Sequence, residues 1–158
     1  MLLRPSHPAS SYGEAVDRLF TNPRIGEHQV HRIEAERSDR EAVLDEYERE
    51  LPDDFDIVLL ELGLDGHVAA LFPDSTAFDE GERRVALVEC EQKPHWRMTL
   101  APRVLAGAER SYVVACGRER AKVVRRALRE ELDPRELPAR LVAGGVWILD
   151  RAAAAGLD

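Results

Sequence analysis

Residues 61–75, ELGLDGHVAALFPDS, place a carboxylate, two glycines and a histidine directly after an apolar run, FDIVLL. Imidazole titrates near neutral pH, so His67 is a candidate general acid or base. Asp65 could fix the turn by accepting backbone hydrogen bonds, while Gly63 and Gly66 permit backbone angles that side chains disfavour. A histidine at such a junction can equally be a capping or packing residue, so the spacing leaves both interpretations open.

The elements that must position these residues follow from hydrophobic periodicity. Short apolar runs alternate with helical patterns, which predicts an α/β fold: a mostly parallel sheet flanked by helices, Rossmann-like in layout. Strands are expected at 55–62, 83–90, 111–116 and 144–150, with a brief strand at 30–33. Helices are expected at 10–20, 38–51, 117–132 and 151–157. We predict one domain spanning residues 1–158.

Two details of this prediction concern the site directly. The nearly uninterrupted apolar run at 55–62 is typical of a strand covered on both faces. Ligands of open α/β sheets gather at the carboxyl ends of strands, where residues 63–67 would lie. His67 would then stand at the start of a helix, where the helix dipole favours a neutral imidazole. Elsewhere, Ser10 or Ser11 is expected to cap the first helix, and Ser38 with Glu41 to form a capping box on the second.

Other clusters could bind a ligand but are less specific. In CGRERAK, Arg118 or Arg120 and the backbone N–H groups could hold a phosphate, or the arginines could simply be solvated. In KPHWRMTL, residues Lys93 and Arg97 belong either to a surface loop or to the wall of an anionic-substrate site. His28 and His31 have no third ligand nearby, so we predict no metal site. No Gly-x-Ser-x-Gly elbow is present, which gives no support to an acyl-enzyme mechanism.

Composition narrows the class of protein. The chain has 158 residues and a formal net charge of −8, so nucleic acid and anionic membranes are not expected partners. No apolar run approaches the roughly 20 residues that span a bilayer, and the first residues lack the apolar centre of a secretion signal. We therefore expect a cytoplasmic protein. Cys90 and Cys116 lie in strand-like surroundings and are expected to be buried thiols.

These motifs together resemble the 6-phosphogluconolactonase family, whose signature is Gly-x-Gly-x-Asp-Gly-His followed by Leu-Phe-Pro. LGLDGHVAALFPDS carries that likeness, and HPASSYG, VHRI, KPHWRMTLAPRVLAGA, YVVACGRERAKVVRRAL and VWILDRAAA are similar to further segments in the same order. The related glucosamine-6-phosphate deaminases share Asp-Gly-His but continue with an Asn-Glu-Pro type of segment. The segment ALFPDS, which follows Asp-Gly-His-Val-Ala here, resembles the corresponding segment of the lactonases instead.

The resemblance implies a metal-free, cofactor-free enzyme of the pentose phosphate pathway that hydrolyses the δ-lactone of a phosphorylated sugar acid. It implies His67 as the residue that activates water and Asp65 as its support. It also implies that the CGRER turn, with Arg118 and Arg120, holds part of the substrate phosphate. We place Gly63, Gly66 and Arg97 in the same substrate site.

Several departures from the family pattern bear on this expectation. Glu61 stands at the first glycine of the motif, and Arg120 at the position of a lysine, which keeps the charge but changes the geometry. Ser11 replaces an asparagine and Ala101 a threonine.

A whole region of the family pattern also has no counterpart here. The family's amino-terminal half, with its Ser-Gly-Gly-x-Thr phosphate loop, is missing, so we expect weak activity or, as an alternative, a non-catalytic phosphosugar-binding or regulatory module. A sheet without its first strands would expose apolar surface, so we also expect a homo-oligomer or a partner that covers it.

Overall fold

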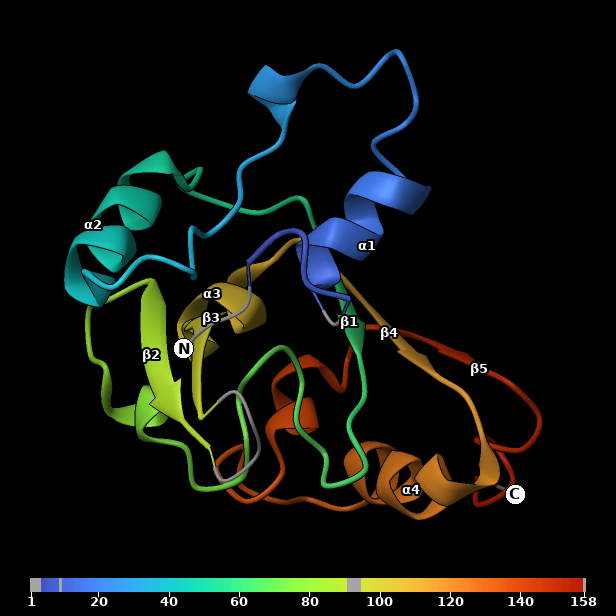
Figure 1. Cartoon of the computed structure of the whole chain (residues 1–158). Helices are drawn as coiled ribbons and strands as arrows, with labels where there is room; N and C mark the ends of the chain where they lie inside the picture. The colour runs from blue at the N-terminus through green and yellow to red at the C-terminus, as the bar shows by residue number, and fades with distance from the viewer. Residues whose placement is uncertain (1–3, 9, 91–94, 158) are drawn as a thin grey trace.

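Three parallel strands form the central sheet of the computed structural model, which describes residues 4–8, 10–90 and 95–157 (Figure 1). They are β1 (Ile57–Glu61), β4 (Arg110–Ala115) and β5 (Val146–Leu149), in the order β1-β4-β5. Their register places Leu59 beside Tyr112, and Tyr112 beside Val146. The predicted α/β class with a mostly parallel sheet is therefore confirmed.

A second sheet is antiparallel, and neither of its strands pairs with a strand of the central sheet. It consists of β2 (Val85–Glu89) and β3 (Trp96–Leu100), with Val85 opposite Leu100. The sequence predicted β2 within 83–90, but it did not predict β3. Residues 96–100 form a strand where we considered a surface loop, because an antiparallel partner lies beside them. Lys93, in the same predicted wall, lies outside the described residues.

Four α-helices accompany the two sheets in the described part of the chain: α1 (Ser11–Arg18), α2 (Arg40–Glu50), α3 (Pro102–Gly107) and α4 (Ala121–Arg129). Short 3-10 helices occur at η1 (Glu27–Gln29), η2 (Thr76–Asp79), η3 (Arg118–Arg120) and η4 (Pro138–Val142). Figure 1 shows α2 beside β2, and α4 on the path between β4 and the carboxyl-terminal segments.

The two predicted helix caps have different outcomes. Ser10 caps α1 as expected, since its hydroxyl accepts a hydrogen bond from the Gly13 N–H at 3.2 Å. The capping box of Ser38 and Glu41 is wrong, because Asp39 is the N-cap and makes no side-chain cap bond. The Asp39 carboxylate is held instead by the Arg37 guanidinium, 2.6 Å away.

Some predicted elements are absent or shorter. Residues 30–33 join no strand in the described part of the chain, so the brief strand predicted there is wrong. Residues 151–156 form turns rather than a helix, with the Ala153 N–H bonded to the Asp150 carboxylate. The helix predicted at 117–132 is divided into η3 and α4, and it ends at Arg129, since Glu130 is extended.

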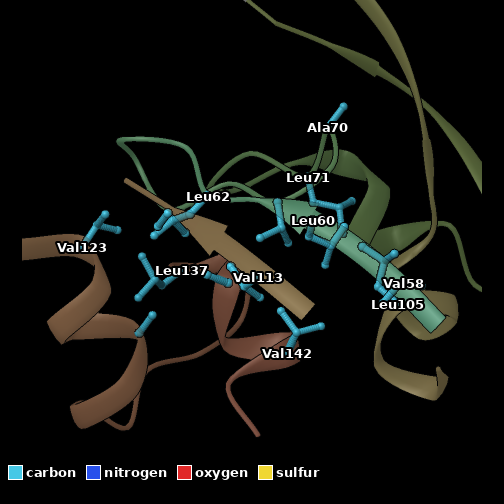
Figure 2. Close-up of a cluster of buried hydrophobic side chains, with 14 of the residues drawn as sticks. Val58, Leu60, Leu62, Ala70, Leu71, Leu105, Val113, Val123, Leu137 and Val142 are labelled. Carbon is cyan, nitrogen blue, oxygen red and sulfur yellow. The ribbon is translucent and has the colours of Figure 1, made fainter. Parts of the chain in front are cut away.

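The hydrophobic core lies on one face of the central sheet. Val58 and Leu60 of β1 point into it, and Figure 2 shows them with Val113 and with side chains from α4 and η4. Gathered there are Val58, Leu60, Leu62, Ala70, Leu71, Leu105, Val113, Val123, Leu137 and Val142.

The opposite face of the same sheet is open. Ile57, Leu59, Val146 and Ile148 are 53%, 71%, 52% and 51% exposed. The prediction that β1 is covered on both faces is therefore wrong, because no layer formed by the described residues buries these four side chains. Cys116 is also exposed and Cys90 half-buried, contrary to the expectation of two buried thiols.

In the described residues, no helix combines the length and apolarity that crossing a bilayer requires.

Candidate active site

A tight turn at the carboxyl end of β1 carries the Asp-Gly-His residues. The Gly63 N–H donates to the His67 carbonyl at 2.9 Å, and the Gly66 N–H donates to the Gly63 carbonyl at 3.1 Å. Val68 then forms an antiparallel bridge back to Leu62. No helix starts at His67, because residues 67–75 form turns and isolated bridges, so the helix start expected there is wrong.

Both glycines of the turn are required by its geometry, for different reasons. Gly66 has φ +91°, a conformation that side chains disfavour, and a Cβ there would also overlap Leu137, which is fully buried. A Cβ on Gly63 would overlap the His67 ring itself. Gly66 therefore lets the chain pack onto the core, and Gly63 makes room for the imidazole.

Asp65 holds His67 through both its backbone and its ring. One carboxylate oxygen, Oδ1, lies 2.6 Å from the ring Nδ1 and 3.1 Å from the backbone nitrogen of His67. An ionised carboxylate can only accept, so we assign the proton to Nδ1, which leaves Nε2 free to act as a base. The side chains of Asp65 and His67 are 47% and 31% exposed, and the pair is therefore accessible to solvent and ligand.

Phe72 and Arg97 lie next to the imidazole. The rings of His67 and Phe72 are 4.6 Å apart at 44°, and the guanidinium of Arg97 lies 5.8 Å from the centre of the Phe72 ring. Arg97 projects from β3, and its Nε contacts the Cys90 sulfur at 3.4 Å. The second sheet thus brings a cation to the turn that follows β1.

An open pocket of about 850 Å³ runs from this turn along β1. It brings together five of the site residues that we predicted: Gly63, Asp65, His67, Arg97 and Arg120. Gly66, within the turn, is buried and does not line the pocket. Arg118 is exposed and lies outside the pocket lining, so only one of the two arginines of the CGRER turn faces this space.

Arg120 is anchored over the carboxyl ends of β1 and β4. Its Nε donates to the Leu62 carbonyl at 2.9 Å, and its Nη1 donates to the Cys116 carbonyl at 3.0 Å and to Glu119 at 2.8 Å. Nη2 lies 3.6 Å from a carboxylate oxygen of Glu61. The guanidinium is therefore fixed in place, and its Nη2 edge faces Glu61.

The CGRER turn itself is tied to the end of β5. The Gly117 N–H lies 3.2 Å and 3.1 Å from the two carboxylate oxygens of Asp150. Hydrogen bonds from the backbone N–H groups of Ala153 and Gly117 lower the pKa of the Asp150 carboxyl. Because Asp150 occupies the Gly117 N–H, that group would have to change partner before it could bind a phosphate.

Sequence reasoning missed three features of this site. Phe72 stands within the Leu-Phe-Pro motif but was not predicted to contact His67. Ala69 lines the pocket with φ +52°, which is uncommon for a residue with a side chain and marks local strain. Asp150 directly follows β5, and a carboxylate next to the carboxyl end of a strand was the only signal that could have pointed to it.

The described residues contain no group of three or more histidine, cysteine or acidic side chains placed to hold a metal ion. His31, one of the two histidines that we considered, lies 3.4 Å from Glu50.

Comparisons with known proteins agree with the resemblance. The pattern of the family described as glucosamine-6-phosphate isomerases/6-phosphogluconolactonase matches residues 2–149. The 6-phosphogluconolactonase of Haemophilus influenzae is 30% identical over 161 residues, covering 96% of this chain and 68% of that protein. The human 6-phosphogluconolactonase is 36% identical over 161 residues, covering 94% and 62%.

The solved structures extend the likeness to the fold. The 6-phosphogluconolactonase of Trypanosoma brucei superposes with a TM-score of 0.83 at 28% identity, covering 99% of this chain and 71% of that chain. This chain thus spans about two thirds of the length of these relatives. Since the match to the family pattern runs through both sheets and the Asp65–His67 turn, the chain belongs to the glucosamine-6-phosphate isomerase/6-phosphogluconolactonase family.

Proposed function

We propose that the chain hydrolyses the δ-lactone of a phosphorylated sugar acid, with His67 as the residue that activates water. The hydrogen bond between Asp65 and the Nδ1 of His67, on the wall of an open pocket, is the observation that carries this proposal. The names of the relatives, which are 6-phosphogluconolactonases, support the same substrate class.

The expected chemistry needs one residue that moves a proton. With its Nδ1 proton donated to Asp65, His67 takes a proton from water at Nε2 while the water oxygen attacks the lactone carbonyl carbon. The tetrahedral intermediate then breaks its bond to the ring oxygen, which takes the proton back from Nε2. The products are a free carboxyl group and a hydroxyl group. Asp65 orients the ring and stabilises the imidazolium without itself accepting the proton.

Two arginines give the pocket its expected affinity for an anion. Arg97 and Arg120 both line it, and Arg120 is anchored by two backbone carbonyl groups. A guanidinium held in this way loses little freedom when a phosphate binds. We assign Arg120 to the substrate phosphate and leave Arg118, which does not line the pocket, as a contact of lesser importance.

The test is the hydrolysis of 6-phosphogluconolactone, with the spontaneous rate subtracted because such lactones open without help. His67→Ala should lower the catalysed rate about 10²–10⁴-fold, the usual contribution of a general base. His28→Ala is the matched control, since His28 is exposed on η1 and does not line the pocket. Equal rates for wild type and His67→Ala would refute catalysis by His67. The alternative function, a non-catalytic phosphosugar-binding or regulatory module, would then be the one to test.

We also propose that a second copy of the chain covers the open face of the central sheet. Parallel sheets are ordinarily covered on both faces, and this one exposes Ile57, Leu59, Val146 and Ile148. Two copies would bury two such faces at once, as in an isologous dimer. We continue to expect that the protein is cytoplasmic and that the chain forms one domain.

A further inference from the structure

Glu61 lines the pocket, and its carboxylate lies 3.6 Å from the guanidinium of Arg120. It is the last residue of β1, and the alternation of the strand puts it on the open face with Ile57 and Leu59. Its side chain is 82% exposed and lines the pocket together with Arg120. Among the residues that the structure describes, its carboxylate makes no hydrogen bond, and it forms an ion pair with Arg120 at 3.6 Å.

The donors of Arg120 are unequally available. Nε is committed to a backbone carbonyl, and Nη1 to a second carbonyl and to Glu119. Only Nη2 has no backbone partner, and it is the nitrogen nearest to Glu61. An anionic ligand that enters the pocket must therefore reach Arg120 at the edge that Glu61 occupies.

We propose that Glu61 is a specificity-determining residue that competes with the anionic group of the substrate for Arg120. This inference rests on the proposed function, because it concerns the substrate class of the same pocket. The competition weakens the binding of a phosphorylated ligand and leaves an uncharged sugar lactone unaffected. Glu61 thus shifts the preference of the site from doubly charged towards weakly charged sugar acids and lactones.

The size of the effect follows from charge and distance. A phosphate on Nη2 would lie within several ångströms of the Glu61 carboxylate, and unit charges at 4 Å in water repel enough to change an equilibrium about fivefold. A dianion doubles that repulsion, so removing the charge should tighten its binding about 5–30-fold at low salt. A monoanion whose charge lies farther from Arg120 should gain less.

The experiment measures binding by isothermal titration calorimetry, so it does not depend on turnover. The ligands are 6-phosphogluconate and gluconate, and the proteins are wild type, Glu61→Gln and Glu109→Gln. Glu109 is the matched control, because it is also an exposed carboxylate near an arginine, 3.5 Å from Arg110, but outside this pocket. We expect Glu61→Gln to bind 6-phosphogluconate about 5–30-fold more tightly in 50 mM salt, less so in 500 mM salt.

Gluconate affinity should change about twofold or less in Glu61→Gln, and Glu109→Gln should match wild type with both ligands. The gain should disappear when Arg120→Gln is added to Glu61→Gln, because Glu61 acts through that guanidinium. Unchanged or weaker binding of 6-phosphogluconate by Glu61→Gln would overturn the proposal, as would a pocket that binds no 6-phosphogluconate in either protein. The two proposals can fail separately. If His67→Ala hydrolyses the lactone as fast as wild type while Glu61→Gln still binds 6-phosphogluconate more tightly, catalysis is refuted but the competition for Arg120 is not.

Discussion

The two glycines of the Asp65–His67 turn offer the sharpest test of how the turn works. Gly63→Ala and Gly66→Ala add the same methyl group three residues apart, yet the structure predicts opposite consequences. A Cβ at Gly63 overlaps the His67 ring, which can move aside, whereas a Cβ at Gly66 overlaps buried Leu137. The first change should therefore affect catalysis, and the second should affect folding.

The magnitude for Gly66→Ala has two parts. The left-handed backbone costs about 1–2 kcal/mol for a residue with a side chain, and overpacking against the core costs about 1–3 kcal/mol. Together they destabilise the fold by about 2–5 kcal/mol, a large part of the stability of a typical domain. At about 2–4 °C per kcal/mol for a chain of this size, Tm should fall by roughly 4–20 °C.

Gly63→Ala should leave Tm within about 2 °C of wild type, because Gly63 has no positive φ and only an accessible ring must shift. It should lower lactone hydrolysis about 10²-fold, since a misplacement of about 1 Å has that effect on positioned groups. The assays are thermal unfolding by circular dichroism and hydrolysis above the spontaneous rate. Gly107→Ala is the control, because nothing lies within 4 Å of its Cβ position.

A Gly63→Ala protein with wild-type hydrolysis and an unchanged imidazole NMR signal of His67 would contradict the steric role of Gly63. In that case the ring would not need the space that Gly63 provides. A Gly66→Ala protein as stable as wild type would equally contradict the packing argument for Leu137.

Two further predictions concern stability and assembly. Because hydrogen bonds lower the pKa of Asp150, its carboxylate contributes stability above the unfolded pKa of about 4 and loses it as the pH falls through the lower folded value. Asp150→Ala should therefore lower Tm at pH 7, with a difference that shrinks towards pH 3; a constant difference would contradict the linkage. Sedimentation velocity at micromolar concentration should show a dimer of the wild type and a shift to monomer in Leu59→Glu, whereas a wild-type monomer would overturn the proposed second copy.

Local sequence determined the parts of the fold whose interactions lie close together along the chain. The strands β1, β2, β4 and β5 follow from their apolar runs, and Ser10 caps α1 within three residues of its partner. The turn that holds Asp65 and His67 is also local, because its hydrogen bonds join residues two to four positions apart. Such short-range contacts can be predicted from residue types and spacing alone.

Tertiary structure decided what depends on distant segments. β3 forms because β2 lies beside it, and the alanine-rich stretch after β5 forms turns where Asp150 binds both Ala153 and the distant Gly117. The pocket takes Arg97 from β3 and Arg120 from η3, which follows β4, and only the tertiary structure shows that Arg118 lies outside it. Whether β1 has one covered face or two is likewise a property of neighbouring layers, which its apolar run could not reveal.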